Sequence, residues 1–253
     1  MKFIDSHTHV DFPEFDEDRI DALVRAKQSG VEKIILSATV AKGWKSIETL
    51  AENHSIIAPA YGLHPMFMAE HQAHHLEQLQ DYLGKKKPIA IGEIGLDFFI
   101  SNPDKHAQLD LFCTQLDLAV EYNLPVIIHA RKSLDLVLRE LRKRPQVHGS
   151  IHSFSGSEQQ ARQLIDLGFY LGFGGPITYT RATKLRRLVS VLPLESILLE
   201  TDAPDQPDAK HFGMRNEPAY LSFIANEIAD IRNISLEEVA EQTLRNTKTL
   251  FEL

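Results

Sequence analysis

The sequence lacks the residues that build disulfide-linked or membrane-spanning proteins. It contains one cysteine, Cys113, so no intrachain disulfide can form, and this favours a reducing compartment. No apolar run approaches the roughly 20 residues that cross a bilayer. The first residues also lack the basic segment and long apolar stretch of a signal peptide. We therefore expect a cytoplasmic protein with no membrane partner, and nothing indicates an obligate protein partner.

An excess of positive charge is absent as well. The formal net charge is −8, which argues against a protein that coats nucleic acid through bulk charge. It does not exclude an enzyme that engages phosphates locally, because bound metal ions can supply the positive charge.

Short apolar, β-branched runs alternate with longer stretches of helical spacing, and this alternation predicts the fold. Eight such units in 253 residues match a single-domain (β/α)₈ TIM barrel over residues 1–253. A doubly wound open sheet is the alternative. The expected strands are Phe3–Asp5, Lys33–Ser37, Ile56–Tyr61, Ile89–Glu93, Val126–His129, Gly149–His152, Phe169–Phe173 and Ile197–Thr201.

Helices are expected over Asp16–Gly30, His106–Asn123, Ser157–Gly168 and Arg181–Leu192, with two more in Glu217–Phe251 separated near Asn233. In the first of these, Ile20, Leu23 and Val24 recur at the helical offsets of three and four. Ser235, followed three residues later by Glu238, predicts a capping box at the start of the last helix.

Histidines and carboxylates stand where the expected strands end. His7 and His9 follow the first strand, His64 the third, while Glu93 ends the fourth, His129 the fifth, His152 the sixth, and Glu200 and Asp202 the eighth. The carboxyl ends of parallel barrel strands open on one face, where the active sites of such enzymes are built. Residues far apart in sequence should therefore converge.

These residue types suit divalent metal ions. His7 and His9 point to the same side of a strand and can bind one ion together. Glu93 is placed to bridge two ions, with His129 and His152 on the second ion. Asp202 either orients the attacking water or completes the first site. Nitrogen and oxygen ligands without cysteine suit zinc or manganese, and magnesium less well.

A purely structural role is the alternative to metal binding for each of these residues. A lone buried histidine is usually a hydrogen-bonded core residue, and a single HxH pair is weak, but the whole strand-end set makes that reading improbable. His64 either contacts substrate or caps a turn before Pro65. We expect His148 to be structural, since it precedes its strand, and His211 to be solvent-exposed. Asp5 and Asp97 could brace loops by accepting backbone N–H bonds.

The basic residues divide between the two ends of the expected barrel. Lys85–Lys87 and Arg142–Arg144 precede strands and fall on the face away from the chemistry. Arg131 lies on the catalytic face, and we place Arg181, Lys184 and Arg215 there as well. Each of these could hold a phosphate or pair with a surface acid.

The motifs FIDSHTH, GLHP, GEIGLD, PVIIHARKSLD, HSFSG, LLETDAP and RNEP resemble those of the TatD-like metal-dependent deoxyribonucleases of the amidohydrolase superfamily. The resemblance covers about residues 3 to 250 and implies a barrel with two divalent metal ions. The implied ligands are His7, His9, Glu93, His129, His152 and Asp202. Substrate-contacting or supporting roles are implied for His64, Arg131 and Glu200, and we group Glu200 with Asp202 as candidate catalytic carboxylates.

The activity that the resemblance implies is phosphodiester hydrolysis, often 3′→5′ exonucleolytic on DNA. Two positions depart from the pattern: Phe98-Phe99 follows GEIGLD where many relatives have a tyrosine, and Ser133 replaces threonine or alanine. The first departure could alter how a base stacks.

Three hypotheses follow. In the first, hydroxide generated at the metals attacks phosphorus, Asp202 positions or deprotonates the water, and Arg131 with His64 steadies the phosphate. In the second, an amidohydrolase uses the same site on a small ester, amide or lactone, as the acidic charge and Phe98-Phe99 slightly favour. The third is a non-catalytic metal-binding protein, which would leave no coordination position open.

Overall fold

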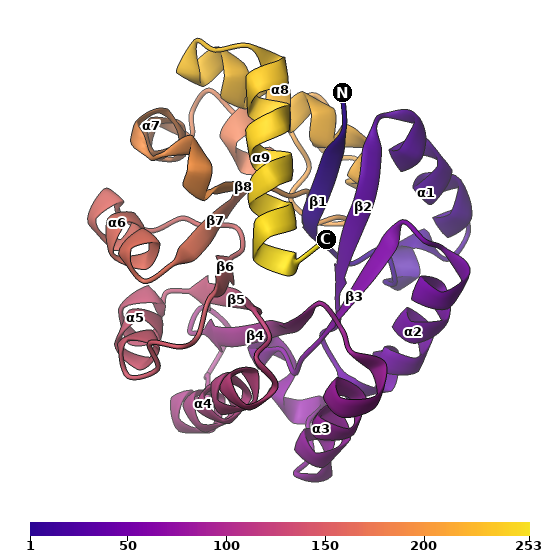
Figure 1. The fold of residues 1–253 in the computed structure, drawn as a ribbon, viewed down its shortest axis with the longest axis vertical. Coiled ribbons are helices and arrows are strands. Elements are labelled where there is room, and N and C mark those ends of the chain that lie inside the picture. Colours follow the sequence, from indigo (N-terminus) through magenta and orange to yellow (C-terminus); the bar gives the residue numbers. More distant parts are fainter.

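The predicted barrel is confirmed by the computed structural model, which describes residues 1–253. Eight parallel strands form one sheet, in which each strand pairs with the next along the chain (Figure 1). The strands are β1 Phe3–Thr8, β2 Val31–Ser37, β3 Ile57–Tyr61, β4 Ala90–Asp97, β5 Val126–Arg131, β6 Gly149–Ile151, β7 Phe169–Phe173 and β8 Ile197–Leu199.

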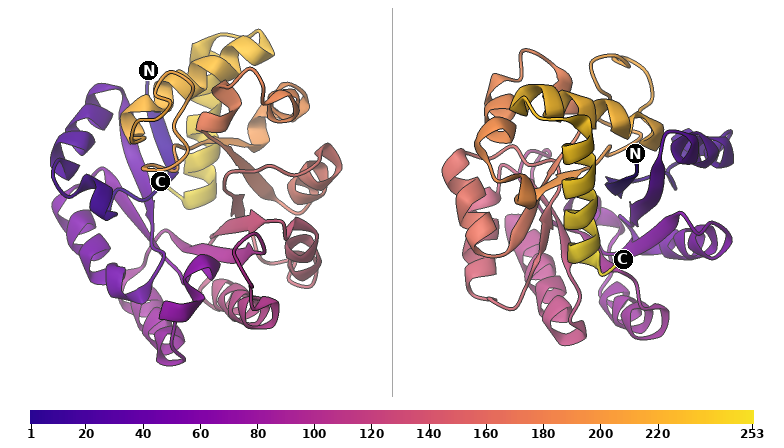
Figure 2. Two further views of the ribbon diagram at one scale, coloured as in Figure 1. Left: turned by 180° about the vertical axis from the view of Figure 1, so that it is seen from behind. Right: turned by 45° about the horizontal axis from the view of Figure 1, so that its top comes forward.

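Helices surround this sheet on the outside (Figure 2). They are α1 Arg19–Gln28, α2 Trp44–Asn53, α3 His74–Lys86, α4 Lys105–Tyr122, α5 Leu134–Arg142, α6 Glu158–Asp166, α7 Thr183–Val191, α8 Leu221–Arg232 and α9 Leu236–Phe251. None of them combines the length and apolar character that a membrane span requires.

Helix α1 turns a different face to the core than its apolar spacing predicts. Ala22, Leu23 and Ala26 are buried, whereas the side chains of Ile20 and Val24 are 49% and 45% exposed. Alanine is small enough to let a helix lie close to its neighbours. The buried face of α1 therefore includes the two small alanines, and the larger Ile20 and Val24 lie outside it. The spacing thus predicted the helix correctly but not its buried face.

The capping prediction was half right. The backbone N–H of Glu238 donates to the Ser235 hydroxyl at the start of α9, as expected. The reciprocal capping box lies instead at the start of α6, where Ser157 and Gln160 each accept the other's backbone N–H. Asn233, in the left-handed region with φ 53°, ends α8 near the predicted break.

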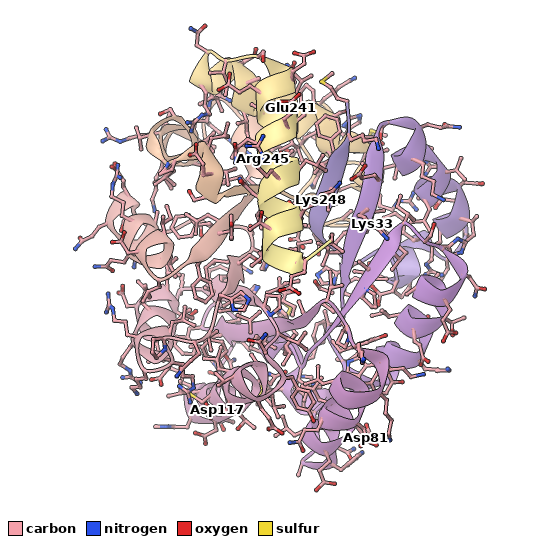
Figure 3. The ribbon with its side chains drawn as sticks, viewed as in Figure 1. Lys33, Asp81, Asp117, Glu241, Arg245 and Lys248 are labelled. Carbon is pink, nitrogen blue, oxygen red and sulfur yellow. The ribbon has the colours of Figure 1, made fainter.

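Helix α9 closes the barrel at the end opposite the strand termini that carry the histidines. It runs across the sheet between β1 and β8 (Figure 1), and its Lys248 Nζ lies 2.7 Å from Glu32 of β2; Lys248 and Lys33 are labelled on this side in Figure 3. Leu250 and Phe251 fill the floor of the barrel. The apolar cluster there comprises Ile4, Ile35, Ala58, Ala60, Ala90, Ile127, Leu198, Leu250 and Phe251.

The first and last strands meet at a seam without a regular strand ladder, so the barrel is nearly closed. Buried Asp5 accepts hydrogen bonds from the Thr201 hydroxyl at 2.5 Å and from the Thr201 N–H at 3.0 Å. Beyond it, the N–H of Asp202 donates to the His7 carbonyl at 3.0 Å. Asp5 therefore does accept backbone N–H bonds, as predicted, and it joins the two ends of the sheet.

Two strands carry an irregularity where a predicted ligand stands. The pairing of β1 with β2 shifts register between Asp5 and Thr8, around His7, and that of β4 with β5 shifts between Ile91 and Ile94, around Glu93. A bulge of this kind bends the strand and re-aims a side chain. Glu93 thus reaches the barrel mouth although it lies inside β4 and not at its end, where it was predicted.

Candidate metal centre

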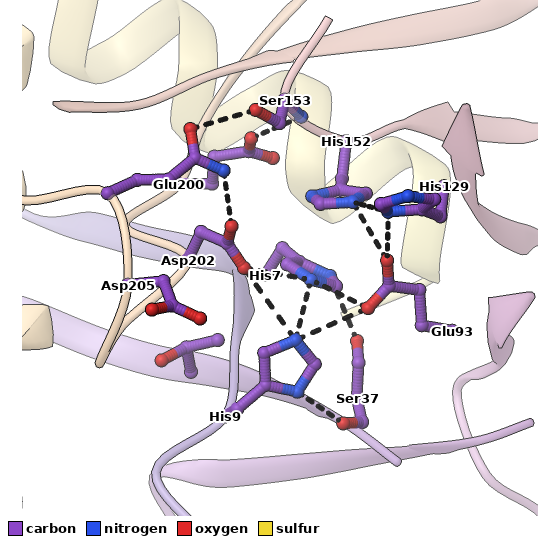
Figure 4. A network of polar contacts seen from close by, with 12 residues as sticks. His7, His9, Ser37, Glu93, His129, His152, Ser153, Glu200, Asp202 and Asp205 are labelled. Atoms are coloured by element: carbon purple, nitrogen blue, oxygen red, sulfur yellow. Dashed lines mark hydrogen bonds and ion pairs between the residues drawn. The ribbon is translucent and has the colours of Figure 1, made fainter. Parts of the chain in front are cut away.

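The six predicted metal ligands lie together at the C-terminal end of the barrel (Figure 4). His7 and His9 bring their Nε2 atoms within 3.1 Å of each other. His129 Nδ1 and His152 Nε2 form a second pair, 3.0 Å apart. Asp202 Oδ1 faces the first pair, 3.4 Å from His7 Nε2 and 3.6 Å from His9 Nε2. All the donor atoms of this cluster are thus within reach of bound cations.

Glu93 stands between the two histidine pairs. Its Oε2 lies 3.2 Å from Nε2 of His7 and 3.2 Å from Nε2 of His9. Its Oε1 lies 3.1 Å from Nδ1 of His129 and 2.8 Å from Nε2 of His152. Each carboxylate oxygen therefore serves a different pair, and this is the arrangement expected of a bridging ligand.

An outer layer of acceptors fixes two of the imidazole rings. His9 donates its Nδ1–H to the Ser37 carbonyl at 2.9 Å, and His129 donates its Nε2–H to Asp97 Oδ2 at 3.1 Å. The lone pairs of His9 Nε2 and His129 Nδ1 are left pointing into the cluster, as in metal sites whose ligands are oriented from behind. The Ser37 hydroxyl contacts Nδ1 of His7 at 3.1 Å.

Sequence reasoning missed these supporting roles. Asp97 accepts the Phe99 N–H at 2.8 Å, which is the loop-bracing contact predicted for it, but it also orients His129. Ser37 was only the last residue of an expected strand. Its position at a C-terminal strand end, beside the histidines, was the one signal in the sequence that pointed to a role.

His64 differs from the other histidines. The Met66 N–H donates to its Nδ1 at 3.1 Å, so in the neutral ring the proton is on Nε2. That Nε2 lies 3.0 Å from Glu93 Oε1. An Nε2–H group donates a hydrogen bond and cannot coordinate a cation, although the atom lies among possible ligands. Burial lowers the pKa of His64 to about 4, which keeps the ring neutral.

Asp202 is held from both sides. Its backbone is in the left-handed region, with φ 56°, which is uncommon for a residue with a side chain. Its Oδ2 accepts a hydrogen bond from the Gln206 side chain. Burial opposes ionisation of Asp202, but contact with His7 outweighs it and brings the pKa of the carboxyl to about 2.

Glu200 lies behind this group and does not line the cavity. Its Oε1 accepts the Ser153 N–H at 2.5 Å, and burial raises its pKa to about 8. Gly172 makes room for it, since a β-carbon on Gly172 would lie 2.0 Å from Glu200 Oε2. Among the roles expected for Glu200, this position fits support better than substrate contact.

A cavity of about 560 Å³ opens over the cluster. Arg131 and His64 line it together with the histidines, and Phe154, Ile177 and Leu185 form an apolar wall. The exposed Arg131 guanidinium makes no ion pair, so it is free to meet an anion.

Two of the other three cations expected on this face, Arg215 and Lys184, have polar partners. Arg215 pairs with Asp18 at 2.6 Å and with Glu217 at 3.5 Å, and Lys184 donates to the Ser155 carbonyl. Arg181 lies over the Tyr179 ring at 5.4 Å. Of the two uses weighed for each of these cations, Arg215 thus adopts pairing with acids, the partly exposed Asp18 and the buried Glu217.

His211 corrects a further prediction, because it is not simply solvent-exposed. Its Nδ1 donates to buried Asp208 at 2.8 Å, and its ring stacks on Tyr220 with centroids 3.5 Å apart. Both contacts fix the loop after β8. His148 stays outside the cluster, just before β6, as expected.

The donor set fits a divalent cation. Two overlapping groups without His64 bring donor atoms within 4.8 Å of one another: His7, Glu93 and His152; and His7, His9 and Asp202. The histidines around Glu93 outweigh its burial and hold the pKa of its carboxyl well below the usual range. Imidazole and carboxylate donors with no thiolate suit zinc or manganese.

Fold and donor set together define a (β/α)₈ barrel with a histidine–carboxylate centre of the kind that binds divalent metals. The family model described as TatD related DNase matches residues 4–252. The chain belongs to this family.

Its relatives match along the whole chain. It is 43% identical to the metal-dependent hydrolase YjjV of Escherichia coli K12, over 99% of this chain and 98% of the relative, and 34% identical to the metal-dependent hydrolase YabD of Bacillus subtilis 168, over 98% of each. The crystal structure of YjjV, a TatD homolog, matches with a TM-score of 0.95 at 42% identity, over 99% of this chain and 98% of that one.

Proposed function

We propose that this protein is a metal-dependent phosphodiesterase that cleaves DNA, with 3′→5′ exonucleolytic hydrolysis as the expected mode. The observation that carries the proposal is the division of Glu93 between two histidine pairs beside an unpaired Arg131. Two divalent cations held by these residues, with the Arg131 guanidinium at the mouth, would match the charge of a phosphodiester and of its transition state.

The chain offers ligands for two ions. His7, His9 and Asp202 would hold one, His129 and His152 the other, and Glu93 would contact both. Bound zinc, manganese or magnesium ions would polarise the phosphoryl oxygens and lower the pKa of water.

The surrounding side chains have defined tasks in this proposal. Asp202 Oδ1 faces the cavity, while Gln206 fixes its other oxygen, so Oδ1 is the atom that orients the attacking water and accepts its proton. Arg131 binds a non-bridging phosphate oxygen. His64, whose Nε2–H donates to Glu93 Oε1 in this structure, supplies a neutral donor beside the same phosphate.

The test uses single-stranded DNA labelled at its 5′ end, incubated with the purified protein and Mg²⁺, Mn²⁺ or Zn²⁺. Cleavage is expected with at least one of these metals, with loss of nucleotides from the 3′ end. His152→Ala should abolish it, whereas the matched variant His148→Ala, altered just before the same strand, should cut like the wild type. No cleavage with any metal, or full activity in His152→Ala, contradicts the proposal.

A second candidate is hydrolysis of a small ester, amide or lactone at the same centre. The apolar wall of Phe154, Ile177 and Leu185 favours it, because such a wall suits a compact organic group. Carboxyl esters and lactones assayed beside DNA separate the two activities. A non-catalytic protein would turn over neither class, and azide would not perturb the spectrum of its cobalt-substituted form.

A further inference from the structure

The segments that follow β4 and end β5 carry a group of aromatic and cationic side chains beside the cavity, from Phe98 to the start of α4 and from Arg131 to Lys132. Phe99 is 52% exposed. Arg131 Cζ lies 3.9 Å and Lys132 Nζ 4.4 Å from the centroid of its ring. Next to it, Lys105 Nζ lies 5.0 Å from the ring centroid of half-buried Phe98. We call these five residues the Phe99 platform.

The cations of the platform are free to bind an anion. Arg131, Lys132 and Lys105 are exposed and form no ion pair, in a chain whose net charge is −8. The acids of the same loops are occupied: Asp97 holds His129 and the Phe99 N–H, and Asp104 accepts the Ala107 N–H at the start of α4. The platform itself therefore carries three cations and no acid.

The platform is rigidly connected to the candidate metal centre. One carboxylate, Asp97, accepts the Phe99 N–H through Oδ1 and the His129 Nε2–H through Oδ2. The Phe98 N–H donates to the Arg131 carbonyl at 2.9 Å. Arg131 itself lines the cavity, so a polymer that leaves the cavity past this residue lies directly on the platform.

We propose that the Phe99 platform binds the nucleotides next to the scissile phosphate of the substrate strand. Cations that track a backbone, combined with an exposed aromatic ring, are the features by which proteins bind single strands without reading sequence. Lys132 can leave the ring to meet a phosphate, since its ammonium sits on a flexible stem. This inference rests on the proposed phosphodiesterase function and extends it.

Binding is measured by fluorescence anisotropy with phosphorothioate oligothymidylates, which resist cleavage, from a dinucleotide to a decanucleotide. The affinity of the wild-type protein should rise with the length of the oligothymidylate. Phe99→Ala should weaken decanucleotide binding about tenfold, within the range of base–aromatic stacking, and Phe99→Tyr should restore it. Lys132→Gln should lower the slope of log affinity against log salt by about 0.7. Oligouridylate should bind similarly, because neither contact reads the 2′-hydroxyl.

Matched controls lie across the mouth, on the loop after β8. Phe212→Ala removes an aromatic ring that is 71% exposed, and Lys210→Gln removes a lysine without an ion pair; both should bind the decanucleotide like the wild type. Equal binding by Phe99→Ala and wild type, or affinity that does not depend on length, overturns the inference.

A small chromogenic diester, bis-p-nitrophenyl phosphate, separates this inference from the proposed function. Phe99→Ala and Lys132→Gln should lower cleavage of DNA by a larger factor than they lower hydrolysis of this small diester. If the wild type cleaves no diester while binding stays length-dependent, the proposed function fails and the platform stands. If Phe99→Ala loses small-diester and DNA cleavage equally, the platform acts on the centre itself and the inference is wrong.

Discussion

The backbone N–H of Met66 donates a hydrogen bond to Nδ1 of His64, and this contact sets the proton of the imidazole on Nε2. His64 is thereby a donor among histidines that point lone pairs at the same cavity. His64→Ala should lower turnover of a phosphodiester by about 10²–10³, the effect of losing one transition-state donor, without changing metal content. His64→Gln should recover part of the rate, because its amide is also a donor.

The metal content of these variants is measured by plasma mass spectrometry. His129→Ala serves as the comparison, since its ring nitrogen faces Glu93, and it should lose bound metal. Loss of metal from His64→Ala to the same extent would mean that His64 is a ligand.

Asp97→Asn should weaken metal binding about 10–100-fold, as found for residues that orient a ligating histidine. The amide oxygen can still accept the Phe99 N–H, but the other atom can no longer accept the His129 Nε2–H. Competition with a chromogenic chelator measures the affinity. Asp104→Asn is the matched control on the same loop, because asparagine caps a helix as well as aspartate does; it should leave the affinity unchanged.

Gly172→Ala should destabilise the fold by about 1–3 kcal/mol, the usual cost of overpacking a core. Its new β-carbon would lie 2.0 Å from Glu200 Oε2. Thermal unfolding measures the loss, and adding Glu200→Ala should relieve it. Gly43→Ala, whose β-carbon would meet nothing closer than 3.9 Å, should cost much less. A Gly172→Ala protein as stable as the wild type would contradict this packing.

The stabilisation that Asp18 provides should be lost in acid. Hydrogen bonds from Arg215 and then Arg25 hold the pKa of its carboxyl well below the usual range. A group with a depressed folded pKa adds stability above its unfolded pKa and loses it as pH falls through the folded pKa. Asp18→Asn should therefore lower the free energy of unfolding by on the order of 1 kcal/mol at pH 7. The difference between variant and wild type should narrow below about pH 5. Urea unfolding of both proteins at pH 7 and below about pH 5 measures this difference, and a difference that does not depend on pH contradicts the prediction.

Much of the fold could be predicted because strand and helix patterns are local. The runs that became β2 and β5 are apolar and β-branched, that of β7 is apolar and aromatic, and all three can be recognised without tertiary context. The register shifts around His7 and Glu93 could not be predicted in this way, because a bulge depends on how the partner strand aligns. For the same reason Glu93 was expected at the end of its strand and lies within it.

The residues of the candidate centre could be predicted from their type and place, but their supporting contacts could not. Histidines at several strand ends stand out, whereas serine and aspartate, such as Ser37 and Asp97, are common residue types at these positions. Their roles depend on which ring nitrogen faces the cavity, and only side-chain orientation reveals that. The buried face of a helix could not be predicted from spacing either: Ile20 and Val24 belong to the expected apolar face of α1 but are exposed.

The seam between β1 and β8 joins segments of the barrel that are synthesised at different times. His7 and His9 lie at the end of β1, whereas the carboxylate of Asp202 and the Thr201 contacts to Asp5 come from just after β8. Domains generally fold as units. While the barrel is being synthesised, the two histidines are therefore present without the carboxylate that follows β8, and the complete donor set for metal forms only when almost the whole barrel has emerged.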